Sequence, residues 1–238
     1  MVRLSKRLKA VASLAGACVT LADVGTDHGY IPVYLVGCKR AKRAIALDVN
    51  PGPLQRAREH IRQYGMEGQV EARLSDGLAA LATGEADQIV IAGMGGGLMM
   101  RILSKGQEVA REAKRLVLQP QSEIAAFRGF LWRNGYRIEA EEMVYEDGKY
   151  YPMMAVRAVG NPVIGQEDKL AQKFGALLLE GRHPVLKEYL LRQRGQKEGI
   201  LRKLKEQGRG DIEARAAEIE GDLRDIERAL GYFGEYRL

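Results

Sequence analysis

The chain has 238 residues, of which 46% are hydrophobic and 29% charged. This is the composition of a soluble globular protein, and the chain is long enough to bury a sizeable core. No apolar run approaches the roughly 18 residues that a membrane span needs. The net charge is +6, with most of the excess in residues 1–159, which hold 22 Lys and Arg against 17 Asp and Glu. Such a charge suits a polyanion such as nucleic acid, although it equally serves solubility.

The N-terminal stretch MVRLSKRLKAVASLAGAC is basic and then apolar, so a signal peptide has to be weighed against an amphipathic helix. The apolar residues Leu4, Leu8, Val11 and Leu14 recur at helical spacing, and a strand-like segment follows at once. We therefore expect a basic helix rather than a signal peptide. The two cysteines, at positions 18 and 38, have no metal-ligand or disulfide spacing, which favours the reducing cytoplasm.

The first two thirds of the chain alternate short apolar segments with helix-length segments, which predicts a doubly wound α/β sheet of the Rossmann-like type. The expected strands are Thr20–Val24, Ala44–Asp48, Val70–Leu74, Gln88–Ala92 and Leu116–Gln119, and the clearest helices are Gly52–Tyr64 and Gly97–Lys105. In such sheets ligands bind at the carboxyl ends of the strands, near the point where the strand order reverses.

The sheet is expected to end in an antiparallel hairpin. Two strand-like runs, Arg137–Tyr145 and Tyr150–Val159, flank the dipeptide Asp147-Gly148, which is a strong hairpin signal. A dinucleotide dehydrogenase would continue with parallel strands instead. The composition changes after this hairpin, so we expect one domain over residues 1–160 and a second over 161–238.

The second domain is expected to be helical. Leu170, Phe174, Leu177 and Leu178 indicate one helix, ended by Gly181–Pro184. Residues 182–209 form a basic segment with a net charge of +6, and residues 210–238 an acidic one with a net charge of −4. The acidic segment has an apolar seam at spacings of 4 and 3: Ile212, Ala216, Ile219, Leu223, Ile226, Leu230 and Phe233. The pattern predicts an antiparallel, coiled-coil-like helical hairpin joined at Gly208–Asp211. The alternative is that the charges only solvate two exposed faces.

Four polar or glycine-rich clusters follow the first four expected strands. They are DVGTDHG at residues 23–29, ALDVN at 46–50, LSDG at 74–77 and AGMGGG at 92–97. Asp48 can accept hydrogen bonds from a ribose diol, which fits NAD and S-adenosylmethionine equally. Asp76 could accept a hydrogen bond from an adenine amino group. The glycine loop after the fourth strand would leave room for a flat substrate.

The first cluster separates the two cofactors. A dinucleotide site needs Gly-x-Gly-x-x-Gly, but Asp27 stands where the middle glycine would let a pyrophosphate approach. A sulfonium carries positive charge and no phosphate, so a nearby carboxylate is tolerable. The pattern therefore favours S-adenosylmethionine.

The segments LSKRL, DVGTDHGYIP, ALDVN, SDGL, AGMGGGLM and LQPQ together resemble the bacterial tRNA adenine-N1 methyltransferase family, which modifies the D-loop adenine at tRNA position 22. The resemblance covers residues 3–159 and is weaker over 166–238, where the family has a helical, coiled-coil-like domain. It implies a class I methyltransferase fold, S-adenosylmethionine as cofactor, tRNA as partner and no metal. It gives no information on protein partners or oligomeric state.

Carried over by motif, the resemblance also implies the site residues. The cofactor residues would be Gly25, Thr26, Asp27, His28, Gly29, Asp48, Val49, Asn50, Ser75, Asp76, Gly77, Gly93 and Met94. The candidate substrate residues come from other observations: Arg7 from the charge of the N-terminal helix, and Gly95 and Gly96 from the room that the glycine loop leaves. Tyr30 and Tyr150 are candidates for stacking on the target base, with ordinary packing as the alternative. Many family members have Ala where this chain has Gly29. An Asn-Pro-Pro-Tyr-like loop, frequent in enzymes that methylate exocyclic amines, is replaced here by Gly93-Met94-Gly95-Gly96, which argues against N6 methylation.

Adenine N1 has a free lone pair at neutral pH, so the enzyme mainly has to align the reactants. Asp27 is the catalytic candidate, as a carboxylate that would stabilise positive charge on the methylated purine; a helix cap or a cofactor contact are its alternatives. Basic residues for RNA docking would be Arg3, Lys6, Arg7 and Lys9, the Lys39–Arg43 cluster, and Arg192, Arg194, Lys197, Arg202, Lys203 and Lys205. Two other functions stay open: a methyltransferase for a small molecule or protein, and a non-catalytic RNA-binding protein.

Overall fold

A computed structural model describes residues 2–162, 168–207 and 212–234. The chain divides into two compact units, residues 1–166 and 167–238. The expected turn at Gly208–Asp211 and the side chain of Lys205 lie outside the described residues.

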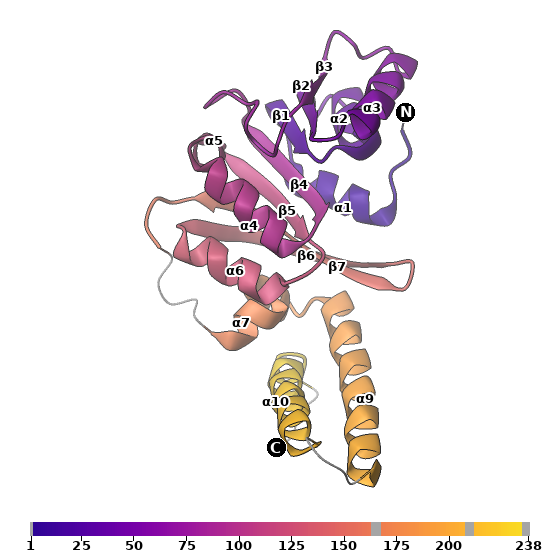
Figure 1. Ribbon diagram of the computed structural model, residues 1–238, viewed down its shortest axis with the longest axis vertical. Helices are drawn as coiled ribbons and strands as arrows, with labels where there is room; N and C mark the ends of the chain where they lie inside the picture. The colour runs from indigo at the N-terminus through magenta and orange to yellow at the C-terminus, as the bar shows by residue number, and fades with distance from the viewer. Residues whose placement is uncertain (1, 163–167, 208–211, 235–238) are drawn as a thin grey trace. The chain divides into compact units, whose positions relative to one another are not determined.

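The first unit is built on a mixed sheet of seven strands in the order β3-β2-β1-β4-β5-β7-β6 (Figure 1). The strands are β1 Cys18–Val24, β2 Ala41–Asp48, β3 Val70–Leu74, β4 Gln88–Met94, β5 Arg115–Pro120, β6 Tyr136–Glu146 and β7 Lys149–Ala158. Strands β1 to β5 pair in parallel, whereas β7 pairs antiparallel with both β5 and β6. The doubly wound sheet and its terminal hairpin are thus confirmed, with the order reversing between β1 and β4.

Helices cover both faces of this sheet. They are α1 Lys6–Ala15, α2 Tyr30–Gly37, α3 Pro51–Gln63, α4 Gly96–Lys105, α5 Gln107–Glu112 and α6 Ile124–Arg133, with a 3-10 turn, η1, at Asp27–Gly29. Helices α1, α2 and α3 pack one face into a core with Leu21, Ala44, Val90 and Val117 of the central strands. Helices α4, α5 and α6 lie together on the other face (Figure 1). Burial of this apolar surface, at about 25 cal/mol per Å², is what holds the layers together.

The expected N-terminal helix is present, but it begins later than its apolar spacing suggested. Ser5 is the N-cap of α1, and its Oγ accepts a hydrogen bond from the amide of Leu8 at 3.3 Å. Leu4 therefore precedes the helix, although it is buried in the same core as Val11. A serine whose side chain satisfies a free amide of the first turn fixes the helix start more strongly than hydrophobic spacing does.

The second unit is helical in its described residues. It contains α7 Lys169–Phe174, α8 Ala176–Glu180, α9 Pro184–Gln207 and α10 Ile212–Gly231. The single helix expected over residues 170–180 is wrong, because Gly175 adopts φ 94° and separates α7 from α8. Helices α9 and α10 pack against each other, and Ile219, Ile226 and Leu230 of the expected seam are buried. No helix of the described residues is long and apolar enough to cross a membrane.

Candidate active site

A cavity of about 270 Å³ opens at the carboxyl ends of β1 and β4, where the strand order reverses. This is the position at which open α/β sheets bind ligands. Its lining comes from α1, from the end of β1 and the turn after it, from the start of α2, and from the ends of β4 and β5: Arg7, Leu8, Asp23, Gly25, Thr26, Asp27, Tyr30, Ile31, Ala92, Gly93 and Gln121. Four of the predicted site residues other than the glycines line this cavity: Arg7, Thr26, Asp27 and Tyr30.

The turn after β1 is tied to the neighbouring strand. The amides of Gly25 and Thr26 both donate to the carbonyl of Leu47 in β2, at 2.8 and 2.9 Å. The chain then passes through two left-handed residues, His28 at φ 64° and Gly29 at φ 66°, before α2 begins. The left-handed region is costly for residues with a Cβ, so this backbone has to be held by its surroundings.

One such support is His60 on α3, whose Nδ1 lies 3.0 Å from the carbonyl oxygen of His28. The His60 ring also contacts Tyr30 edge-on, with 4.8 Å between ring centroids, and Tyr30 stacks on the His28 ring at 5.4 Å. Burial lowers the pKa of His60, more than the hydrogen bond to His28 raises it. We did not predict His60 from the sequence, because it reaches the site only through tertiary contacts with His28 and Tyr30.

Asp23 is a buried acid in the wall of the cavity. Its Oδ2 accepts a hydrogen bond of 2.6 Å from the Thr26 hydroxyl. Burial raises the pKa of Asp23 to about 6; the Thr26 hydrogen bond opposes this shift and the charge of Asp48 adds to it. The sequence showed Asp23 inside the strand end, yet the predicted site left it out.

Asp27 is in a different environment from Asp23. Its side chain is 66% exposed, and its Oδ1 pairs with Arg56 Nη2 at 3.1 Å and with His28 Nε2 at 3.5 Å. Arg56 lies on α3, four residues before His60, and no sequence motif marked it. The carboxylate of Asp27 is thus at the rim of the cavity, in contact with two potential cations.

The ends of β2 and β3 form a second part of the site. Asp48 is buried, and its Oδ1 accepts a hydrogen bond of 2.8 Å from the amide of Asn50, the N-cap residue of α3. Beside it, Val49 and Leu74 are large apolar residues that are 56% and 55% exposed. A buried carboxylate flanked by exposed apolar side chains suits a nucleoside, which combines a ribose diol with a flat base.

Of the residues after β3, Ser75 and Asp76 are already engaged within the chain. The Ser75 hydroxyl donates to the carbonyl of Gly77 at 2.9 Å and accepts from the amide of Ala80 at 3.1 Å. Asp76 is exposed and lies 3.4 Å from Lys105 Nζ. The hydroxyl of Ser75 therefore shapes this loop, whereas Asp76 remains accessible from solvent.

The glycines after β4 fit a neighbouring loop closely. A Cβ on Gly96 would lie 2.6 Å from the carbonyl oxygen of Ser122, and one on Gly95 would lie 3.0 Å from the Ser122 hydroxyl. Their small size thus allows the loop after β5 to approach, which differs from the open space that the sequence suggested. The side chain of Met94 extends over Gly25, and a Cβ added at Gly25 would collide with the Cε of Met94.

Arg7 reaches the cavity from α1. Its Nη1 donates to Oε1 of the fully buried Gln119 at 2.9 Å, and its guanidinium lies over the ring of Tyr151, 5.5 Å from the centroid. The predicted Tyr150 instead contacts Tyr145 across the hairpin, with 4.5 Å between ring centroids, and does not line the cavity. Adjacent residues of a strand point to opposite faces, and this alternation puts Tyr151 rather than Tyr150 beside Arg7.

Besides Arg7, further basic residues expected to dock RNA make contacts inside the protein. Arg40 donates to the carbonyl of Ser13 at 3.3 Å, in the last turn of α1. Lys197 of α9 donates to Asp222 of α10 at 2.7 Å. Both contacts use donors that phosphates would otherwise need, so the charge clusters are at least partly structural.

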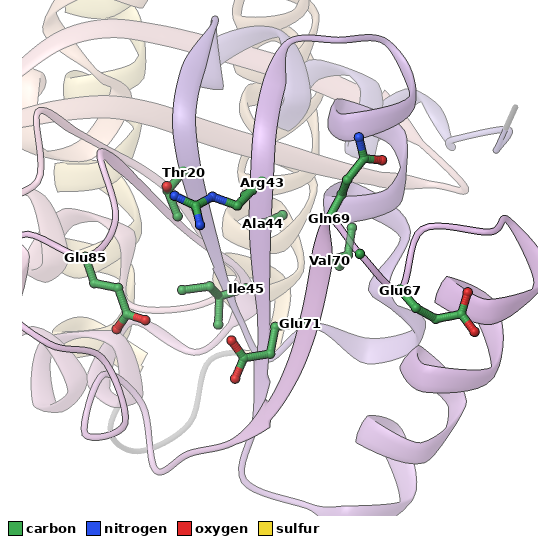
Figure 2. A pocket seen from close by; sticks show the side chains of 10 residues that line it. Thr20, Arg43, Ala44, Ile45, Glu67, Gln69, Val70, Glu71 and Glu85 are labelled. Atoms are coloured by element: carbon green, nitrogen blue, oxygen red, sulfur yellow. The ribbon is translucent and has the colours of Figure 1, made fainter.

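A second cavity, of about 390 Å³, lies at the other end of the strands (Figure 2). Figure 2 shows Glu71 and Glu85 pointing toward each other beneath Ile45. Both carboxylates are hydrogen-bonded to Arg73, at 2.8 to 3.1 Å. Glu71 and Glu85 are thus already engaged by Arg73, and the cavity lies away from the point where the strand order reverses. We therefore regard it as a surface hollow and the first cavity as the functional site.

Comparison with known proteins first identifies the class of protein, which is a methyltransferase. Residues 4–154 match the family model described as a methyltransferase domain. The tRNA (adenine(22)-N(1))-methyltransferase of Bacillus subtilis is 37% identical over 156 residues, which are 66% of this chain and 66% of that protein. The crystal structure of the Bacillus subtilis m1A22 methyltransferase TrmK superposes with a TM-score of 0.84 at 28% identity, covering 97% of this chain and all of that one.

A candidate tRNA (m1A22) methyltransferase from Streptococcus pneumoniae is 32% identical, with a TM-score of 0.87, and the match covers 96% of this chain and 100% of that one. Another structure of the same pneumococcal protein is a complex with S-adenosyl-L-methionine. The chain therefore belongs to the tRNA (adenine-N1) methyltransferase family that its motifs resemble.

Proposed function

We propose that this chain transfers a methyl group from S-adenosylmethionine to N1 of the adenine at position 22 of tRNA. The observation that carries the proposal is the cavity at the β1–β4 switch point, whose wall contains the carboxyl groups of Asp23 and Asp27. Carboxylates there favour a cationic sulfonium donor and disfavour the pyrophosphate of a dinucleotide.

The residues at the carboxyl edge fit the donor. Asp48 has one carboxylate oxygen on the amide of Asn50, and its second oxygen is suited to a ribose hydroxyl. The exposed side chains of Val49 and Leu74 offer apolar surface to an adenine ring, with Asp76 accessible beside them for its amino group. The turn of Gly25, Thr26 and His28 and the loop of Gly93 would enclose the methionine part.

S-adenosylmethionine supplies an electrophilic methyl group when it is bound. The chain has no need to deprotonate neutral adenine, so its own contribution is alignment and electrostatic stabilisation. Asp27 is the residue we assign to the positive charge that develops on the purine, since it is at the cavity rim and faces solvent. Arg56 and His28 would hold its carboxylate in place.

The target base has to leave its tertiary pairing to expose N1, so we expect it to be turned out of the tRNA stack. Tyr30 lines the cavity and is already stacked on His28, which makes it the aromatic surface available to that base. Tyr150, on the hairpin, would contact RNA outside the cavity.

We infer a division of labour between the two units. Residues 1–160 would hold donor and target base, and residues 161–238 would bind the body of the tRNA with exposed cations such as Arg202 and Lys203. The proposed tRNA substrate and the two free cysteines support a cytoplasmic location. The proposal requires neither metal nor membrane.

The experiment that tests the reaction class is label transfer from S-adenosylmethionine to unmodified tRNA transcripts. We expect label in RNA, recovered as 1-methyladenosine after digestion. Donor binding with no label in RNA would instead favour a methyltransferase for a small molecule or protein. RNA binding without donor binding would favour a non-catalytic protein.

A further inference from the structure

The guanidinium of Arg7 is held in a fixed place in the active-site wall. The side chain of Gln119 is fully buried, and its Oε1 lies 2.9 Å from Arg7 Nη1. Because arginine can only donate hydrogen bonds, the oxygen of the Gln119 amide, and not its nitrogen, must face Arg7. The Gln119 Nε2 in turn donates to the carbonyl of Pro120 at 3.1 Å, which fixes the amide orientation. The guanidinium also lies over the ring of Tyr151, 5.5 Å from the ring centroid.

The helix that carries Arg7 is anchored as well. The amides of Lys6 and Arg7 both donate to the carboxylate of Glu146 on β6, at 2.5 and 3.2 Å. Arg7 is therefore fixed in both backbone and side chain, unlike the exposed Arg3 and Lys9 on the same segment. Such fixation favours binding of one ligand group in one geometry.

The surroundings of Arg7 do not suit an RNA phosphate. The same cavity contains Asp23 and Asp27, and two carboxyl groups would repel a phosphodiester brought to Arg7. They match a zwitterion instead: an ammonium would be near the acids and a carboxylate near the guanidinium. A Cβ on Gly93 would lie 3.4 Å from Arg7 Nη1, so Arg7 borders the loop proposed to enclose the methionine part of the donor.

We infer that Arg7 binds the α-carboxylate of S-adenosylmethionine, with Gln119 as the residue that positions it. This inference rests on the proposed function and reassigns Arg7, which the sequence had placed among the RNA contacts, to the methyl donor. Arg3 and Lys9, which are exposed, remain available to phosphates.

The test compares binding of S-adenosylmethionine with that of its decarboxylated analogue, which keeps the nucleoside, the sulfonium and the ammonium. For the wild-type protein we expect calorimetry to show at least a tenfold preference for the intact donor, as a charge-assisted hydrogen bond supplies. Arg7→Ala should remove most of that preference. Arg101→Ala, which removes an exposed arginine of α4, should keep it.

An Arg7→Ala protein that keeps the wild-type preference, and loses affinity for tRNA instead, would overturn the inference. Failure of the wild-type protein to bind either ligand would refute the proposed function itself. Arg7→Lys provides a second variant in case Arg7→Ala does not fold; it keeps the charge without the planar geometry, and we expect an intermediate preference.

Gln119→Leu tests the positioning role, because it removes the acceptor of Arg7 and leaves Arg7 itself. We expect the ratio of the two affinities to fall several-fold while affinity for the decarboxylated analogue changes little. A merely structural role would weaken binding of both ligands equally and leave the ratio unchanged, which would refute the assignment of Gln119.

Discussion

Asp48 illustrates how one buried side chain can carry both a structural and a binding role. One carboxylate oxygen is used by the amide of Asn50, which leaves the other for a ligand. If this oxygen binds the ribose, Asp48→Ala should weaken donor binding by about ten- to a hundredfold, the range of hydrogen bonds to a charged group. Calorimetric titration of both proteins checks this, and an unchanged affinity would remove Asp48 from the site.

Asp27 is expected to act on turnover more than on binding. We predict that Asp27→Ala lowers kcat by roughly ten- to a thousandfold, as loss of one electrostatic contact in a transition state does, while donor affinity falls less. Arg56→Ala is the matched control, because it removes the ion-pair partner at 3.1 Å and leaves the carboxylate. Equal losses of kcat and donor affinity in Asp27→Ala would make this residue a donor contact only.

Asp23 makes the stability of the protein depend on pH in an unusual direction for an acid. Burial raises its pKa in the folded protein from 3.8 to about 6, so the folded state holds the proton more tightly than the unfolded chain. Its contribution to the free energy of unfolding is therefore greatest below pH 4 and is lost as the pH rises to about 6. The loss is at most about 3 kcal/mol.

Asp23→Asn removes this titration and keeps an acceptor for Thr26. Denaturant unfolding at several pH values measures the free energy of unfolding of both proteins. Relative to the wild-type protein, the free energy of unfolding of the variant should rise between pH 4 and 6. A stability difference that stays constant over this range would show that Asp23 does not titrate there.

At the scale of elements, helix α1 and the β6–β7 hairpin are coupled through Glu146. Burial raises the pKa of Glu146, but hydrogen bonds from the amides of Arg7 and Lys6 outweigh this and lower it overall. We expect Glu146→Gln to cost about 0.5–2 kcal/mol, the value of a helix cap, and to speed hydrogen exchange at Lys6 and Arg7. Because its folded pKa is lowered, this contribution persists above the unfolded value of 4.5 and disappears in acid. Unchanged exchange at both amides would disprove the coupling.

Elements with local signals could be predicted from the sequence, and elements that depend on tertiary contacts could not. The hairpin turn was predictable because Asp147-Gly148 adopts φ 49° and 78°, the left-handed pair that this dipeptide favours. The break at Gly175 was not, because one glycine inside a helical pattern is usually tolerated. In the site, Asp48 followed from its strand end, whereas Arg56, His60 and Gln119 contribute through residues distant in the chain.

At the scale of the whole molecule, the two units should be separable in function. The first has its own sheet and core within residues 1–166, so a protein ending there should fold and bind the donor. We predict that it loses at least a hundredfold in methylation of tRNA, because the cations of α9 are gone. Donor binding by calorimetry and label transfer to tRNA check the two halves of this prediction. Full activity of the shortened protein on tRNA would contradict the role proposed for the second unit.

The most direct measurement of the central claim is methyl transfer to two tRNA transcripts that differ only at position 22. One transcript has adenine there and the other guanine, and both receive the full chain and labelled S-adenosylmethionine. We predict 1-methyladenosine in the first transcript and no label in the second. Equal labelling of both, or a methylated nucleoside other than 1-methyladenosine, would contradict the assignment of position 22 and atom N1.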